Sequence, residues 1–353
     1  MDKIKEIVIK EVLIKEIWDQ FIIDSNFEFY SFLQSWEWWE FQELSWKKIV
    51  RFWIYEEKIL IWVLLVIKIR AKRWNYFFIP HWPLIKGDFF KVFGDILWDL
   101  KVYAQLDNMS FIRFNSAVKN TLENREQFKK LNFINAPMHE HAEDTNLLDL
   151  KVSEEELLNN IKKKDRYYIN RAIKEWVKIR IGNEIDHVKK LIEMHQNHAN
   201  RINWKKTYSA FSPEFIKNLY KVFWNNITTI SASFDWKTES ILMTIKFWKI
   251  CVYYIAASNI ISHKFSPNYL CQWEAIKKAK RDWCIIYNFW GVSPDDNPKH
   301  PIAWVSIFKR KFWWYDYSLL HAQDLVLSPT YYITWIIETF RRIKRGYYYK
   351  KPE

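Results

Sequence analysis

The sequence contains very little glycine. Its 353 residues include five glycines and 22 tryptophans, whereas a soluble domain averages about 7% glycine, or roughly 25 residues in a chain of this length. Tight turns and helix ends need residues with positive φ, which glycine adopts without steric cost. Other residues must therefore occupy many such positions in this chain.

Several tryptophans stand where a turn or a helix end calls for glycine. Trp236 follows Asp235 between two apolar runs, where Asp-Gly hairpins are typical. Trp176 and Trp283 each follow a helical stretch and precede a strand-like one, which is the place of a glycine that ends a helix. We hypothesise that the gene reads UGA as glycine and that these codons are written here as tryptophan.

The hypothesis covers 14 positions, which would raise the glycine count from 5 to 19. They are Trp39, Trp46, Trp53, Trp62, Trp74, Trp82, Trp176, Trp224, Trp236, Trp248, Trp283, Trp304, Trp313 and Trp314. Trp18, Trp36, Trp38, Trp273 and Trp290 are interpreted as genuine, and Trp98, Trp204 and Trp335 are undecided. The alternative is an aromatic-rich surface for stacking or membrane contact. UGG codons at most of the 14 positions would refute the hypothesis.

Cysteine and long apolar runs are also scarce. Three cysteines without metal-ligand spacing exclude a disulfide framework and predict neither a metal nor a cofactor. The N-terminal residues lack the apolar core of a signal peptide. The apolar run at 59–69 is interrupted by Lys68 and has the length of a strand. We therefore expect a cytoplasmic protein.

Positive charge predominates. Lysine and arginine number 54 against 41 acidic residues, which gives a formal net charge of +13. Such a balance favours an anionic partner, namely nucleic acid, a phosphorylated substrate or an anionic membrane face.

The length and the apolar pattern predict two α/β domains. Strand-like and helical stretches alternate through the first half, and a second unit begins near Lys151. The order strand, strand, helix, strand recurs in both halves, which suggests two copies of one α/β unit. The last stretch, 330–344, has the pattern of an amphipathic helix with a basic end.

Four segments carry a more specific pattern. They are Phe-Leu-Gln-Ser at 32–35 with Trp38, Ile-Pro-His-Trp-Pro at 79–83, Asp-Arg-Tyr-Tyr-Ile-Asn-Arg-Ala at 165–172, and Tyr-Asn-Phe-Trp-Gly-Val at 287–292 followed by 300–314. With glycine restored, the last stretch contains Ala-Gly-Val-Ser-Ile-Phe-Lys-Arg-Lys-Phe-Gly-Gly. Together these segments resemble the FemAB/FemX family of peptidoglycan-bridge aminoacyltransferases, in its compact form without a coiled-coil arm.

The resemblance implies an α/β fold of two GNAT-like domains, each a mixed β-sheet flanked by helices. Residues 1–148 with 322–353 would form the muropeptide-binding domain, and residues 149–321 the domain on the tRNA and acyl side. The reaction would move an amino acid from aminoacyl-tRNA to the stem-peptide amine of a peptidoglycan precursor. The acceptor would be UDP-MurNAc-pentapeptide or a lipid-linked muropeptide. We expect a monomer, and peripheral contact with the inner membrane is left open.

The resemblance also assigns site residues. Lys309, with Phe308, matches the family's pair at the acyl centre, and Arg201 lies where the family binds the precursor's diphosphate. The remaining assignments are Tyr254, Asn115, Trp38 and Gln42 for the substrate, and Lys164, Arg166 and Arg171 for tRNA. Asn115 departs from the family, which often has an aspartate there, and an amide cannot accept a proton at neutral pH.

Two other classes of function remain open. A GNAT-type N-acyltransferase using coenzyme A would need a glycine-rich loop at a helix N-terminus to bind the pyrophosphate. No Gln/Arg-X-X-Gly-X-Gly segment is present even with the 14 glycines restored. A non-catalytic RNA-binding or membrane-associated protein is supported by the charge and by the basic end of the helix at 330–344.

Overall fold

The computed structural model describes residues 7–11, 14–25, 29–56, 59–71, 74–82, 84–85, 89–202, 210–259, 265–312 and 315–349. The chain divides into two compact units. The first unit is Met1–Glu143 with Ser318–Glu353, and the second unit is Asp144–Tyr317. The sequence placed the first division between residues 148 and 149. The structure places it earlier because residues 144–149 form one strand of the second unit's sheet.

The first unit is built on a mixed sheet with the strand order β1-β2-β3-β4-β6-β15-β7, and β5 pairs with β3. The strands are β1 (Ile7–Glu11), β2 (Lys48–Glu56), β3 (Ile59–Arg70), β4 (Asn75–Pro80), β5 (Leu84–Ile85), β6 (Phe111–Asn115), β7 (Ile134–Asn135) and β15 (Gln323–Val326). The helices are α1 (Lys15–Asp24), the 3₁₀ turn η1 (Phe32–Gln34), α2 (Trp36–Leu44), α3 (Phe89–Leu106), α4 (Leu122–Lys130) and α11 (Tyr331–Arg345). β4 and β6 are parallel, whereas β3–β4 and β6–β15 are antiparallel.

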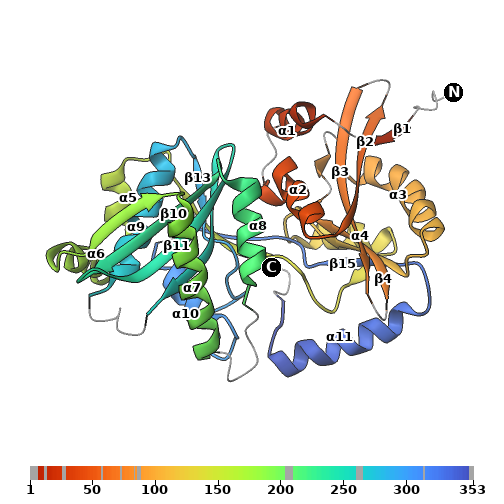
Figure 1. Cartoon of the computed structure of the whole chain (residues 1–353). Coiled ribbons are helices and arrows are strands. Elements are labelled where there is room, and N and C mark those ends of the chain that lie inside the picture. Colours follow the sequence, from red (N-terminus) through yellow and green to blue (C-terminus); the bar gives the residue numbers. More distant parts are fainter. Residues whose placement is uncertain are drawn as a thin grey trace. The chain divides into compact units, whose positions relative to one another are not determined.

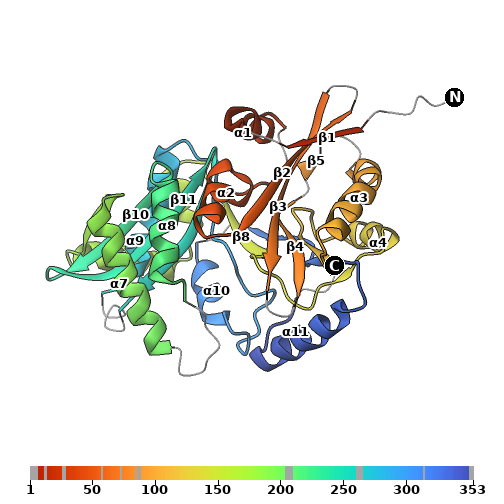
Figure 2. The same cartoon turned by 45° about the vertical axis from the view of Figure 1, so that its right-hand side comes forward.

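Helices cover both faces of this sheet. Figures 1 and 2 show α1 and α2 on one side of β2 and β3, and α3 on the other. The centre of β3 is an uninterrupted apolar run that is buried throughout, as expected for a strand covered on both faces. Phe93 of α3 packs its ring against Phe114 of β6 and Phe133, so aromatic contacts join helix and sheet.

The C-terminal segment completes the first unit. β15 lies between β6 and β7, pairing with both. Arg113 of β6 donates to Asp324 of β15 at 2.8 and 2.7 Å and to Glu338 of α11 at 2.8 Å. These charged groups are buried, and burial of a charge is tolerated only when it is paired. The network therefore fixes β15 and α11 to the first sheet.

The second unit repeats the architecture with the order β14-β8-β13-β12-β11-β10-β9. Its strands are β8 (Asp144–Asp149), β9 (Lys178–Gly182), β10 (Ile227–Phe234), β11 (Lys237–Phe247), β12 (Ile250–Ser258), β13 (Ile286–Asn288) and β14 (Tyr315–Ser318). Its helices are α5 (Glu154–Asn160), α6 (Lys163–Lys174), α7 (Ile185–Ile202), α8 (Pro213–Phe223), α9 (Pro267–Arg281) and α10 (Ala303–Lys309). In Figure 1, α7 and α8 lie on one face of this sheet, and α6 and α9 lie on the other. The expected fold class, two mixed sheets each flanked by helices, is confirmed.

Three helices end in the same motif with tryptophan at its left-handed position. After α6, the N–H groups of Trp176 and Val177 donate to the carbonyls of Ile173 and Ala172, and the φ of Trp176 is 58°. This is the Schellman motif, which favours glycine at that position because a side chain there is strained. The ends of α2 and α9 repeat it with Trp46 and Trp283, whose φ values are 62° and 63°.

Two hairpin turns also have tryptophan at positions with positive φ. Asp235 and Trp236 have φ values of 48° and 62° between β10 and β11, the conformation in which Asp-Gly is preferred. Trp248, with a φ of 49°, opens the turn between β11 and β12. Among the described residues, eleven non-glycine residues have positive φ and six of them are tryptophans. The predicted glycine-type backbone is therefore confirmed at Trp46, Trp176, Trp236, Trp248 and Trp283.

The other positions of the glycine hypothesis fall into three groups, by burial of the indole, by backbone conformation and by whether the structure describes them. Trp39, Trp53, Trp62 and Trp82 have buried indole N–H groups without a hydrogen-bond partner in the described part of the chain. Trp74, Trp224 and Trp304 do not have positive φ. Trp313 and Trp314 lie outside the described residues, as does the undecided Trp204. Trp290 was interpreted as genuine, but its φ is 59°; we revise that interpretation because this backbone is the one that favours glycine.

Among the helices described, none is both long and apolar enough to cross a membrane.

Candidate functional site

In the second unit, polar side chains gather where two parallel strands end. β12 and β13 run parallel only from Ile250 to Val252, opposite Ile286 to Asn288. Beyond this pairing β12 continues to Ser258, while the chain after β13 turns away into the loop at 289–293. In open α/β sheets, ligands bind beyond the carboxyl ends of such strands. This position is the candidate acyl-transfer site.

Lys309 is the charged side chain buried at this position. It ends α10, and its Nζ donates to the carbonyl oxygens of Gly291 at 2.7 Å and Trp290 at 3.3 Å. Only 7% of the residue is exposed, and its Nζ lies 5.5 Å from the ring centre of Tyr253. Burial lowers the pKa of Lys309 to about 7. The amine can therefore be either charged or neutral near neutral pH, unlike a solvated lysine.

Tyr254 and Lys309 meet at one residue, Trp290. The ring of Tyr254 lies 6.0 Å from the indole of Trp290 in an edge-on arrangement, and Lys309 binds the carbonyl of the same residue. Tyr254 also stacks on Phe211 at 5.5 Å. With glycine at position 290, the indole would be absent and the space beside Tyr254 would open.

Phe308 packs on the core of the second unit, whereas Arg201 is exposed at the surface. Phe308 packs edge-on against Tyr269 at 5.3 Å and against Phe312 at 5.5 Å, so its contacts hold α10 on the core of the second unit. Arg201 is exposed near the end of α7, where its Nη2 contacts His198 Nδ1 at 2.8 Å and the carbonyl of Ser258 at 3.1 Å. Arg201 thus lies beside the last residue of β12.

The three basic residues of α6 that were assigned to tRNA, Lys164, Arg166 and Arg171, do not lie on one face of the helix. Successive residues of a helix are rotated by about 100°, so Lys164 and Arg171 share a face whereas Arg166 points the other way. Arg166 Nη1 donates at 2.7 Å to the carbonyl of Asn159 at the end of α5. Its side chain therefore caps a helix, as basic groups near helix C-termini do, and contact of these residues with tRNA stays a prediction.

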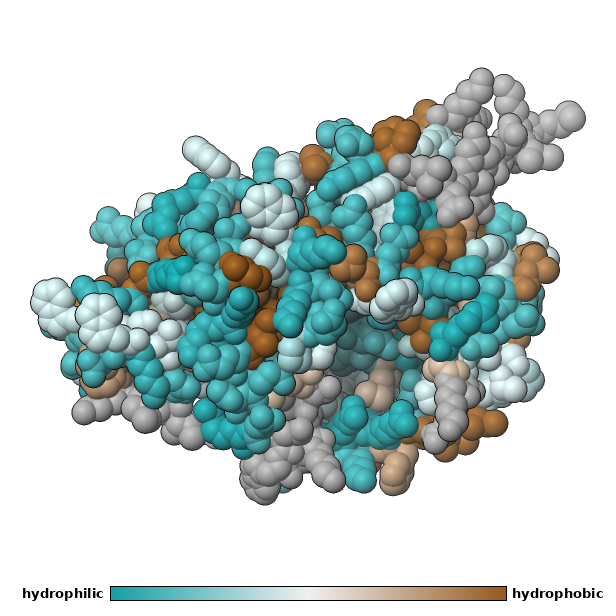
Figure 3. Space-filling view, in the orientation of Figure 1, coloured by the Kyte–Doolittle hydropathy of each residue, from teal (hydrophilic) through white to brown (hydrophobic). Residues whose placement is uncertain are grey.

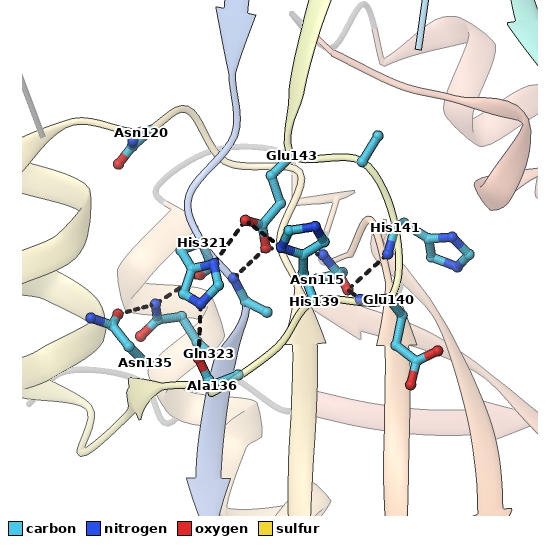
Figure 4. Close-up of polar contacts among 12 residues, drawn as sticks. Asn115, Asn120, Asn135, Ala136, His139, Glu140, His141, Glu143, His321 and Gln323 are labelled. Atoms are coloured by element: carbon cyan, nitrogen blue, oxygen red, sulfur yellow. Dashed lines mark hydrogen bonds and ion pairs between the residues drawn. The ribbon is translucent and has the colours of Figure 1, made fainter. Parts of the chain in front are cut away.

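The first unit has a corresponding parallel pair, β4 and β6, which ends at Pro80 and Asn115. Asn115 Oδ1 accepts from the N–H groups of Glu140 at 3.0 Å and His141 at 3.4 Å, and its Nδ2 donates to Glu143 at 3.4 Å (Figure 4). An aspartate at position 115 would face the Glu143 carboxylate. Asparagine at position 115 can donate to this carboxylate, whereas an aspartate would be repelled by it. The carboxylate at this place is therefore supplied by Glu143.

Glu143 is the centre of a buried hydrogen-bond network. Its Oε2 contacts Nδ1 of His321 at 2.7 Å and Nδ1 of His139 at 3.2 Å, and its Oε1 accepts from the Ala322 N–H at 2.7 Å (Figure 4). Burial acts to raise the pKa of Glu143, but the charges and hydrogen bonds of the two histidines outweigh it and hold the pKa well below its usual range. Glu143 is therefore a poor proton acceptor at neutral pH.

His321 links two parts of this network. Its Nδ1 lies 2.7 Å from Glu143 Oε2, and its Nε2 lies 2.8 Å from the carbonyl oxygen of Ala136. His139, Glu143 and His321 also offer ligand atoms within 4.8 Å of one another, a donor set of the type that binds transition metals.

Trp38 and Gln42 lie on α2, on its buried side. The ring of Trp38 packs edge-on against Phe32 at 5.4 Å and against His141 at 5.7 Å. Gln42 is 1% exposed, and its Oε1 has no hydrogen-bond partner in the described part of the chain. Trp38 and Asn115 therefore both contact His141, through the ring and the backbone respectively.

The sequence interpretation missed the histidines and Glu143. The signal was present, because His139, His141 and Glu143 alternate along one short segment and can share a side of an extended chain. Nothing local to His321 connects it with that segment, because 178 positions separate it from Glu143.

Comparison with known proteins bears on the family and on the fold. The model of the FemAB family matches residues 237–315, the part of the second unit that contains Lys309. The predicted resemblance is confirmed by this match together with the structural likeness to FemX. No curated protein sequence matches the chain.

Solved structures share the fold at low sequence identity. The crystal structure of FemX aligns with a TM-score of 0.78 and 14% identity, over 94% of this chain and all of that one. A tandem GNAT protein from the clavulanic acid biosynthesis pathway aligns with a TM-score of 0.55 and 8% identity, over 92% and 99%. The C-terminal domain of a putative lysylphosphatidylglycerol synthetase from Agrobacterium fabrum aligns with a TM-score of 0.51 and 10% identity, over 93% and 97%. The tandem GNAT-like fold is thus shared across these proteins.

Proposed function

We propose that this protein is an aminoacyltransferase that moves an amino acid from aminoacyl-tRNA to the stem-peptide amine of a peptidoglycan precursor. The observation that carries the proposal is Lys309, a buried lysine with a pKa of about 7 at the open end of β12 and β13. The lysine lies inside the segment that matches the FemAB model. The FemX fold supports the same class of reaction.

In the proposed reaction, the neutral amine of the acceptor attacks the ester carbonyl of aminoacyl-tRNA. The C–O bond of the ester then breaks, and the ribose hydroxyl leaves with the proton that the amine loses. Negative charge develops on the carbonyl oxygen, and a preorganised cation stabilises it most strongly where water is excluded. The ammonium form of Lys309 supplies this charge and orients the acceptor end of the tRNA.

Arg201 serves the acceptor side in this proposal. Guanidinium binds phosphate oxygens with two parallel hydrogen bonds, and Arg201 is an exposed arginine beside the end of β12. Its role is ground-state binding of the precursor's diphosphate, which is separable from the chemistry at Lys309.

Transfer from charged tRNA to a UDP-linked muropeptide tests both roles. We expect Lys309→Ala to lower kcat about 10²–10³-fold, with the muropeptide dissociation constant unchanged. Arg201→Ala should raise the muropeptide KM while kcat changes little. Lys311→Ala and Arg180→Ala are matched controls, because Lys311 pairs with Asp165 and Arg180 pairs with Asp186.

Wild-type turnover in Lys309→Ala would remove the catalytic assignment. Transfer from acetyl coenzyme A, without transfer from aminoacyl-tRNA, would replace the proposal with a GNAT-type N-acyltransferase.

A further inference from the structure

Helix α11 is attached to the first unit through its polar side. Tyr331, Thr334 and Glu338 are its buried residues. The hydroxyl of Tyr331 donates to Asp324 at 2.7 Å, and Glu338 accepts from the buried Arg113 at 2.8 Å. These bonds fix the rotation of the helix about its own axis.

The opposite side of α11 is apolar and faces solvent. Its exposed residues are Tyr332, Ile333, Ile336, Phe340 and Ile343, with exposed fractions of 55%, 62%, 63%, 68% and 67%. At about 100° per residue, these five side chains fall within an arc of roughly 100°, diametrically opposite the buried residues. In Figure 3, brown and tan residues lie beside teal ones at the lower right, where α11 lies in Figure 1. A soluble helix normally turns its apolar stripe toward the core, so this orientation is reversed.

The charges on α11 indicate what covers this face. Arg341, Lys344 and Arg345 are exposed at its C-terminal end. The only acidic residue of the helix, Glu338, points inward and is paired with Arg113. At about 100° per residue, Lys344 borders the apolar arc, Arg341 lies farther round on the same flank, and Arg345 lies on the side of the buried residues. An apolar stripe with basic residues on one flank and at its C-terminal end matches an anionic lipid surface, where the apolar side chains enter the acyl boundary and the long cationic side chains reach the headgroups.

The length of α11 sets the mode of contact. Its 15 residues span about 22 Å, which is shorter than the hydrocarbon core of about 30 Å. The helix can therefore lie in the interface plane but cannot cross the bilayer.

We propose that the apolar face of α11 docks the protein on an anionic phospholipid membrane, with the helix parallel to the surface. The face is preformed, since the Arg113–Glu338 pair holds the polar side against the sheet. Docking requires neither tRNA nor muropeptide. One consequence rests on the proposed function: an aminoacyltransferase held at the membrane takes its acceptor from lipid-linked precursors.

Co-sedimentation of the full-length protein with vesicles tests the proposal. We expect binding to vesicles of phosphatidylglycerol and phosphatidylcholine, and at least about tenfold weaker binding to phosphatidylcholine alone. The double variant Ile336→Glu/Phe340→Glu should lose about tenfold or more in vesicle affinity. Leu106→Glu/Leu122→Glu is the matched control, because it makes the same change of charge at two exposed leucines of the same unit, 78% and 58% exposed, and it should bind like the wild type.

A second pair of variants keeps the test independent of the apolar substitutions. Lys344→Glu/Arg345→Glu should weaken binding to the anionic vesicles, and added salt should weaken wild-type binding. Equal vesicle binding by wild type and Ile336→Glu/Phe340→Glu would overturn the proposal. So would a wild-type dimer that ignores vesicles and dissociates in the double variant, since the face would then join two copies of the chain. Vesicle binding is read without substrates, so its failure leaves the transfer assay unaffected.

Discussion

Replacing left-handed tryptophans with glycine should stabilise the second unit. Trp176, Trp236 and Trp283 have φ values of 58°, 62° and 63° and exposed fractions of 77%, 101% and 87%. A side chain at such φ costs about 1–2 kcal/mol, which glycine would remove. Glycine also makes the unfolded chain more flexible, which offsets up to about 1 kcal/mol of that gain. Because little packing is lost, each change should gain roughly 1 kcal/mol. The triple variant should gain about 3 kcal/mol.

Differential scanning calorimetry measures this gain. At about 2–4 °C per kcal/mol for a domain of this size, the triple variant should melt roughly 6–12 °C higher. Trp224→Gly is the control, because Trp224 is also exposed but has a right-handed backbone at the end of α8, so no gain is expected there. Unchanged or lowered melting of the triple variant would refute the strain argument. UGG codons at these three positions would refute the coding hypothesis separately.

Two further predictions concern charge. The pKa of Lys309 is about 7, and the proposed role needs its charged form. The transfer rate of the wild type, divided by that of Lys309→Arg, should therefore fall about tenfold per pH unit above pH 7, because the arginine stays charged. A ratio that stays constant with pH would exclude a role for the charged form. Glu143→Gln removes one partner of the buried Glu143–His321 pair and should lower the free energy of unfolding in urea at pH 7 by about 3–5 kcal/mol. Because the folded-state pKa of Glu143 lies below its ordinary value of 4.5, its contribution is full above that pH and is lost as the pH falls, so the difference should shrink in acid.

The sequence predicted the two α/β units because their strands are long apolar runs and their turns have local signatures. Trp176, Trp236 and Trp283 were recognised from their neighbours alone, since a Schellman motif and a two-residue hairpin are set by a few adjacent residues. Trp290 was missed because its left-handed backbone follows an Asx turn, in which its N–H donates to Asn288 at 2.7 Å, rather than a helix or a hairpin.

The site was predicted only in part, for a similar reason. Lys309 was found through a motif, but its burial depends on carbonyls 18 and 19 residues away. The Glu143 network joins residues far apart in sequence, and periodicity carries no information on such pairs. The basic end of α11 was visible in the sequence, whereas the outward direction of its apolar face depends on Arg113, more than 200 residues earlier.

The position of β15 has a consequence for biosynthesis. β15 lies between β6 and β7 in the first sheet, but the whole second unit is encoded between β7 and β15. A ribosome therefore releases most of the first sheet long before its missing strand exists, while the second unit is complete when Tyr317 emerges. We expect the second unit to fold first and the first unit to close last, with its unpaired β6 edge exposed to chaperones or to another nascent chain in the interval.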